Sequence, residues 1–297
     1  GTFNDLYIVG DFDTIYSSSQ ILYCGIGYWN GQVFGKVGEG LCPHVGDGAW
    51  SMDLYTSAIG SAGDLFVGGK FESRVWNGTQ FVSILNVGHF NGRWLPLDGG
   101  ALACDRNCVV EVLSLEWTNA GAVLYLGGIF NTIAGQPCTS SIAMWTKQYG
   151  LVSFPGGSIS HDDGTPGRIN RLQFVEALDS LFVTGDFDRV NRTPCSGVAA
   201  WFRADNFWSC MLNKTSDSTQ MRNIHTMTLS NSSIYVAGEV FKSSIFVGLE
   251  GLHTVLKLDL EDYKSSIKAL SGLNKSEAKP SPGQRLSKWK SDRRDHG

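Results

Sequence analysis

The sequence predicts an all-β fold, and within that class a β-propeller built from four-stranded antiparallel blades. Three observations predict it. One short motif recurs five times at near-equal intervals, and an aromatic strand pattern follows most copies. The chain also combines 36 Gly with nine Trp and 16 Phe. Such a density of glycines and aromatics suits short strands that are joined by tight turns.

The recurring motif is an apolar strand that ends in glycine and phenylalanine. Its first copy reads Leu6-Tyr-Ile-Val-Gly-Asp-Phe12. The five copies occupy residues 6–12, 65–71, 124–130, 181–187 and 234–241. Their anchor glycines are Gly10, Gly69, Gly128, Gly185 and Gly238, at spacings of 59, 59, 57 and 53 residues. Regular intervals between similar copies indicate an internal structural repeat.

Each repeat has further strand patterns around the motif. A small-apolar run ends in an aromatic at 26–29, 87–90, 142–145 and 198–201, and these aromatics are Trp29, Phe90, Trp145 and Trp201. Asn-Gly pairs follow the first two runs and predict a hairpin to a returning strand. A preceding strand is predicted at 110–117, 169–174 and 224–229. Four short strands per repeat are typical of a propeller blade, with the aromatics expected between blades.

The repeats extend over residues 1–262, and a basic tail that is expected to be disordered covers 263–297. That tail holds nine of the 24 basic residues and three acids. The first copy has no strand before it, and the last has only a weak partner at 255–260. Two interpretations remain open: the chain is a fragment with an incomplete ring, or its two partial blades complete each other.

Seven cysteines are present. Their places in the repeat predict disulfides Cys24–Cys42 and Cys195–Cys210 within blades, and Cys104–Cys108 as a loop clasp, with Cys138 left over. Buried free thiols in a reducing compartment are the alternative.

Five Asn-x-Ser/Thr sequons predict glycosylation at Asn77, Asn191, Asn213, Asn231 and Asn274. Together with the cysteines, they favour a secreted or cell-surface glycoprotein. No apolar run approaches about 18 residues, so no membrane span is predicted. The net charge of −4 is not the basic charge that is typical of a nucleic-acid-binding protein.

No catalytic, cofactor-binding or metal-ligating residue is predicted. The six histidines lack metal-ligand spacing, and His89 is expected to be packed or exposed. Residues 160–165 partly match the Asp-box of sialidase-type propellers, but an ordinary turn is the better interpretation. Asp53, Glu116 and Glu176 are acids that nothing in the sequence brings together.

The Gly-Gly-x-Phe motif, the small-apolar-Trp strand and the Asn-Gly turn together resemble a known repeat. They are similar to the propeller repeats of the cortical cell-polarity (bud-site selection) marker family, and more loosely to kelch and galactose-oxidase central domains. The resemblance covers roughly residues 1–250. It implies a glycosylated cell-surface ectodomain that interacts with other proteins. That family usually has a membrane anchor after its propellers, and this chain shows none.

The functional hypothesis is an extracellular or cell-surface interaction module that binds a protein or glycan through blade loops. Two alternatives remain: a propeller enzyme, either a carbohydrate oxidase or a glycoside hydrolase, and a structural spacer in a larger surface protein. The ligand and the oligomeric state are not predicted.

Overall fold

The computed structural model describes residues 5–10, 12, 14–15, 21–22, 25–38, 40–41, 53–59, 64–76, 79–97, 102–103, 108–118, 121–133, 135–137, 141–212, 220–230, 233–242 and 253–259. Contacts divide the chain into two units, Gly1–Leu258 and Asp259–Gly297. The basic tail expected at 263–297 lies outside the described residues.

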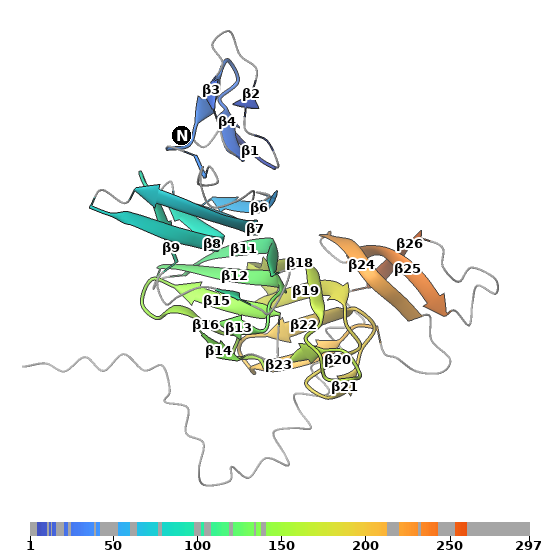
Figure 1. The fold of residues 1–297 in the computed structure, drawn as a ribbon. Coiled ribbons are helices and arrows are strands. Elements are labelled where there is room, and N and C mark those ends of the chain that lie inside the picture. The colour runs from blue at the N-terminus through green and yellow to red at the C-terminus, as the bar shows by residue number, and fades with distance from the viewer. Residues whose placement is uncertain are drawn as a thin grey trace, which may run out of the picture. The chain divides into compact units, whose positions relative to one another are not determined.

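Three four-stranded antiparallel sheets, each in sequence order, form the centre of the first unit (Figure 1). The first holds β6 (Asp53–Ile59), β7 (Leu65–Trp76), β8 (Phe81–Phe90) and β9 (Trp94–Pro96). The second holds β11 (Val109–Thr118), β12 (Gly121–Ile129), β15 (Ile142–Thr146) and β16 (Gly150–Ser153). The third holds β18 (Arg168–Val175), β19 (Ser180–Asp186), β22 (Val198–Phe202) and β23 (Phe207–Cys210).

Two three-stranded sheets flank these in the sequence. One contains β1 (Leu6–Val9), β4 (Ile26–Trp29) and β5 (Phe34–Lys36), and the other β24 (Gln220–Leu229), β25 (Ser233–Lys242) and β26 (His253–Asp259). The described residues contain one short 3-10 helix, η1 (Glu176–Leu178), and no α-helix. The all-β prediction is confirmed.

The two halves of each predicted repeat pair directly with each other. The first leucine of the motif lies opposite the aromatic of the second run in four sheets: Leu6 with Trp29, Leu65 with Phe90, Leu124 with Trp145, and Leu181 with Trp201. The register therefore places the repeated aromatics at one level of these four sheets.

The anchor glycines lie where the first strand of a sheet bulges. The register shifts after Leu54, Val110 and Ile169, and these residues face Gly69, Gly128 and Gly185. A β-bulge brings the neighbouring backbone unusually close. A Cβ on Gly128 would collide with the carbonyl oxygen of Val109, and one on Gly185 with that of Arg168. At Gly128 and Gly185 the bulge therefore leaves no room for a side chain.

Four of the repeats also carry a hairpin, here called the insert hairpin, between the motif strand and the aromatic strand that pairs with it. In three repeats it is β2 (Thr14–Ile15) with β3 (Ile21–Leu22), β13 (Thr132–Ile133) with β14 (Gln136–Pro137), and β20 (Arg189–Val190) with β21 (Thr193–Pro194). The last two pair with short strands that precede their sheets, β10 (Leu102–Ala103) and β17 (Ile159–Ser160). In the remaining case β7 and β8 themselves extend into the hairpin, from Glu72 opposite Leu85 to Trp76 opposite Phe81.

The hydrophobic core lies between successive sheets. Trp145 of β15 packs against Phe66 of β7 at 5.4 Å between ring centroids, and against His89 of β8. Phe154, after β16, packs against Trp201 of β22 at 4.7 Å. Both Trp145 and Trp201 are buried. The repeated tryptophans thus fill space between sheets, as expected from the sequence.

Candidate binding surface

Antiparallel order fixes which loops share an end of a sheet. The turns that join the first strand to the second, such as Thr118 to Gly121, lie at one end, and the insert hairpins lie at the other. Loops that cluster at one end of a rigid β scaffold are the usual place for binding residues. The insert hairpins are therefore the candidate place for side chains that hold a ligand.

The insert hairpin of β7 and β8 ends in two exposed aromatic rings. Trp76 is 54% exposed and Phe81 is 58% exposed. They are cross-strand partners whose ring centroids lie 5.3 Å apart in an edge-on arrangement. Large aromatic side chains left in water this way mark candidate contact sites, since their burial by a ligand is favourable.

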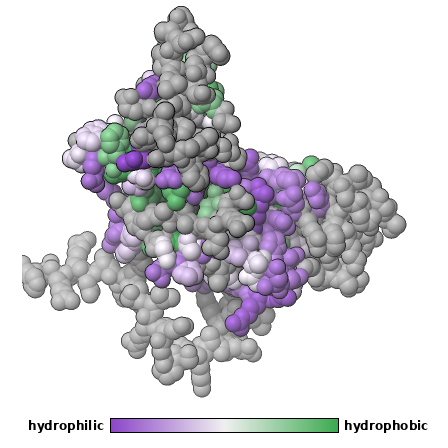
Figure 2. Space-filling model, in the orientation of Figure 1, coloured by the Kyte–Doolittle hydropathy of each residue, from purple (hydrophilic) through white to green (hydrophobic). Residues whose placement is uncertain are grey.

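A cavity of about 330 Å³ lies beside these rings and is here called the aromatic groove. It is lined by Gly38, Gly40, Arg74, Val75, Trp76, Phe81, Phe90, Gly92, Arg93 and Trp94. On the face drawn in Figure 2 most of the described surface is hydrophilic, with a smaller hydrophobic area over the part formed by β7, β8 and β9.

Arginine supplies the charge of the aromatic groove. The Arg74 guanidinium lies 5.9 Å from the centroid of the Phe81 ring, and Arg93 lines the same cavity. No carboxylate is among the described lining residues. The described lining of the groove therefore includes both apolar rings and two arginines.

Buried residues fix the wall of the groove. The Trp94 indole N–H donates to the carbonyl of Val37 at 3.2 Å, and Trp94 is 2% exposed. Gly38 adopts φ +57°, and a Cβ there would lie 2.6 Å from the Phe90 ring. The loop after β5 can approach the aromatic wall only because glycine stands at this position.

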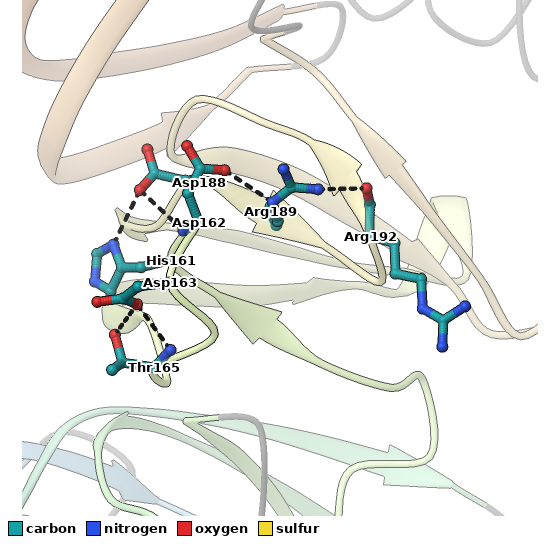
Figure 3. Close-up of polar contacts among 7 residues, drawn as sticks. All are labelled: His161, Asp162, Asp163, Thr165, Asp188, Arg189 and Arg192. Atoms are coloured by element: carbon teal, nitrogen blue, oxygen red, sulfur yellow. Dashed lines mark hydrogen bonds and ion pairs between the residues drawn. The ribbon is translucent and has the colours of Figure 1, made fainter.

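The insert hairpin of β20 and β21 carries charge instead of aromatics (Figure 3). His161 Nδ1 lies 3.3 Å from the Asp188 carboxylate, and Arg189 Nε donates to Asp162 at 2.8 Å. Arg189 also donates to the backbone carbonyl of Arg192 at 3.0 Å. The Arg189–Asp162 ion pair and the His161–Asp188 contact join the hairpin to the turn that follows β17.

The turn at residues 160–165 is held by its own hydrogen bonds. The Thr165 hydroxyl and backbone N–H both donate to the Asp163 carboxylate, at 2.7 and 2.9 Å. These bonds lower the pKa of Asp163 below its ordinary value. The backbone N–H of His161 donates to the Thr165 carbonyl, which closes the turn. The geometry agrees with the turn expected from the sequence.

Two of the three acids considered as a catalytic set have described side chains. Glu116 is buried in an ion pair with Arg203, whereas Glu176 is exposed in η1. The side chain of Asp53 lies outside the described part. His89 stacks on Phe66 and bonds to Asp64 at 2.9 Å, so it is packed. Among the described residues no three His, Cys, Asp or Glu side chains are grouped as metal ligands would be.

Cysteine geometry is described for three of the seven residues. Cys195 and Cys210 form a disulfide, with Cα atoms 5.4 Å apart, which is the pair expected from the sequence. Cys108 is disulfide-bonded as well. Its expected partner, Cys104, and the remaining Cys24, Cys42 and Cys138 lie outside the described residues.

Asn191 is the one predicted glycosylation site within the described residues. Its side-chain carbonyl accepts from the Ser158 N–H at 2.9 Å, and its amide donates to the Gly156 carbonyl at 3.0 Å. Asn191 therefore also has a structural role in holding the 156–158 turn. Asn77, Asn213, Asn231 and Asn274 lie outside the described part, and glycosylation stays a prediction.

No protein-family model matches the sequence, and no curated protein is significantly similar to it. Within the described residues, no helix has the length and apolar character needed to cross a membrane.

Proposed function

We propose that this chain is an extracellular or cell-surface interaction module of the β-propeller type, which binds a protein or glycan ligand through its insert hairpins. One observation carries the proposal. The insert hairpins share one place in the repeat but differ in chemistry: the β7–β8 hairpin exposes two aromatic rings with Arg74 beside them, and the β20–β21 hairpin is charged. A constant scaffold with variable loops at one end is how β folds present binding surfaces.

The propeller arrangement is supported by contacts between the first strands of successive sheets. β11 contacts both β6 and β18, and β18 contacts β24. Blades that radiate from an axis meet in this way along their innermost strands. The buried tryptophans between sheets are consistent with the same arrangement.

The extracellular location is supported by the disulfide chemistry. Cys195 and Cys210 are joined, and Cys108 is bonded too. Disulfides persist in oxidising compartments and are rare in the cytosol. Binding is favoured over hydrolysis because Glu116, a buried carboxylate, is already engaged by Arg203 and Tyr125.

The proposal is tested by presenting the full chain to a panel of immobilised neutral, carboxylated and sulfated oligosaccharides and extracellular-matrix proteins. For each ligand retained, hydrogen–deuterium exchange then maps the site. We expect slower exchange in the bound state at 72–85, 131–137 and 189–194, where the insert hairpins lie. Retention of no ligand, or protection confined to the opposite end of the sheets, would instead favour the structural spacer.

A further inference from the structure

We infer that the open edge of β1 is a docking site for a β-strand of another protein, which pairs with β1 in the antiparallel direction and carries a β-bulge opposite Gly10. The site uses residues other than those of the insert hairpins, so it goes beyond the ligand binding proposed for them. Three observations carry it: an edge that is paired in the related sheets, an exposed leucine, and a glycine that no described neighbour requires.

The edge of β1 has a partner strand in the related sheets. The motif strands β7, β12 and β19 each pair on both sides, with the first strand of their sheet and with the aromatic strand. In the described part of the first sheet, β1 pairs on one side only, with β4 (Figure 1). On that side it matches the other copies, since its anchor glycine donates its N–H to the carbonyl of Gly25, as Gly128 does to that of Ser141. Such an edge can accept an added strand through backbone hydrogen bonds.

Leu6 shows what a docked strand would cover. Its side chain is 62% exposed. Its counterparts in the three four-stranded sheets are at most 1% exposed: Leu65, Leu124 and Leu181. In those sheets the first strand places an apolar residue opposite the motif leucine, namely Ile59, Leu115 and Phe174. A docked strand with an apolar residue at this place would remove the Leu6 side chain from water, which favours binding.

Gly10 shows which kind of strand fits. Gly128 and Gly185 leave no room for a side chain, because the bulged first strand lies against them. Gly10 has the same position in the motif, but among the described residues a Cβ there would make an ordinary contact, with Phe12 at 3.5 Å. Its φ also lies outside the left-handed region. The described sheet therefore gives no reason for glycine at this position, whereas a bulged strand paired with β1 does.

The three four-stranded sheets define the sequence pattern of the docked strand. Each first strand has an apolar residue opposite the anchor glycine, namely Leu54, Val110 and Ile169. The apolar residue opposite the motif leucine follows five residues later in each first strand, whereas the motif leucine and the glycine are four residues apart. The extra residue is the bulge. We therefore expect the partner to present two apolar side chains five residues apart, on a strand of about six residues.

The described first strands are all engaged in their own sheets. Each of them pairs with the motif strand that follows it: β6 with β7, β11 with β12, β18 with β19 and β24 with β25. None of the four can serve β1 without opening another sheet. We therefore assign the docked strand to a different protein.

The test is fluorescence anisotropy of a labelled peptide with the sequence of residues 167–176, titrated with the full, disulfide-bonded chain. This peptide contains the bulge residue of β18, Asn170, and both of its apolar residues, Ile169 and Phe174. We expect saturable binding and slower hydrogen exchange at residues 6–10 in the complex. A control peptide without Asn170 lacks the bulge and should bind about tenfold more weakly.

Gly10→Ala is the most direct variant, because the added Cβ would meet the bulged strand. It should weaken binding of the peptide at least about tenfold, and Leu6→Ser should weaken it about fivefold. The matched control is Val33→Ser, which removes an apolar side chain of similar exposure, 59%, from the turn between β4 and β5. It should leave the dissociation constant within about twofold. Circular dichroism of all variants checks the fold.

The named outcomes decide the inference. No binding, equal binding of the peptide that lacks Asn170, or equal binding to the Gly10→Ala variant would overturn it. Sedimentation of the chain without peptide tests the other occupant. A dimer that Gly10→Ala converts to a monomer would show that a second copy fills the edge, and would overturn the assignment to a different protein. A monomer that binds the peptide at β1 would support that assignment.

Discussion

At the residue scale, Glu116 shows how a buried charge joins neighbouring sheets. Its side chain is 5% exposed, lies 2.5 Å from an Arg203 nitrogen and accepts the Tyr125 hydroxyl at 2.9 Å. Arg203 also pairs with Asp179 and lies 4.8 Å over the Phe174 ring. Burial and the nearby Glu116 charge raise the pKa of Tyr125, so that this hydroxyl stays protonated and donates.

Removal of Arg203 should therefore be costly. Arg203→Met leaves the Glu116 carboxylate buried without its cation, and we expect a loss of about 2–3 kcal/mol in urea unfolding, less than for a wholly buried pair because Arg203 is 38% exposed. The matched control is Arg168→Met, which breaks the more exposed pair with Glu111 and should cost under about 1 kcal/mol. Equal losses of unfolding free energy in both variants would show that the buried Glu116–Arg203 pair stabilises the fold no more than the exposed Glu111–Arg168 pair does.

The turn at 160–165 predicts how the stability of the fold depends on pH. The hydrogen bonds to Asp163 lower its pKa in the folded state. They therefore stabilise the fold at pH values above the pKa that Asp163 has in the unfolded chain. This stabilisation is lost as the pH falls through the pKa that Asp163 has in the folded chain. Thr165→Val removes the hydroxyl donor and should raise the pKa of Asp163 in an NMR titration of carboxyl carbons. Thr165→Ser keeps the donor and should keep the pKa low. A low pKa in the valine variant would assign the shift to another cause.

At the element scale, the bulge of the first strand explains why Gly128 and Gly185 must be glycine. In β12 the backbone of Val109 occupies the space that a Cβ of Gly128 would need. In the first repeat β1 is an edge strand of its described sheet, and among the described residues the nearest neighbour of a Cβ on Gly10 is the Phe12 ring, at 3.5 Å. The same position of the repeat is thus crowded at Gly128 and makes an ordinary contact at Gly10 in the described part of the chain.

These two glycines form a matched pair for mutation. Gly128→Ala should destabilise the chain by about 2–3 kcal/mol, because a strand must shift to admit the methyl group. Gly10→Ala should cost under about 1 kcal/mol, since the added Cβ makes an ordinary contact. Thermal unfolding monitored by circular dichroism measures both. Similar losses would contradict the role of the bulge.

The sequence predicts the sheets well because their pattern is repeated. The strand at 26–29 was placed to the residue, and the pairing of leucine with aromatic follows from the order of the two halves. The insert hairpins could not be predicted in this way, because β13 and β14 have two residues each and show no alternation. The β-bulges opposite the anchor glycines could not be predicted either, because a bulge depends on which backbone lies opposite the glycine in the folded sheet.

The aromatic groove escaped prediction because its key residues lie outside the repeated motif. Trp76 and Phe81 belong to one repeat only, whereas a search for periodicity weights what all copies share. A signal was present: Asn77-Gly78 lies between these aromatics, and Asn-Gly is a strong hairpin cue. The sequence also does not show that Arg74 and Arg93 line one cavity, which follows only from the structure.

At the scale of the whole molecule, the proposed propeller requires sheets that radiate from their first strands. The first strands of successive sheets touch, and tryptophans fill the space farther out. Sheets arranged in this way diverge toward their fourth strands and place the insert hairpins on a shared end, where a ligand can meet several of them. Sheets stacked face to face would stay at a constant separation of about 10 Å.

Distances between spin labels test this arrangement most directly, with labels introduced as noncanonical amino acids so that native cysteines stay intact. One labelled pair replaces Trp117 and Glu176, at the ends of the first strands of two neighbouring sheets, and the other replaces Tyr149 and Phe207, beside the fourth strands of the same sheets. All four side chains are exposed at the same end of the sheets. We predict a clearly longer electron paramagnetic resonance distance for Tyr149–Phe207 than for Trp117–Glu176. Equal distances, or a shorter fourth-strand distance, would contradict the propeller arrangement.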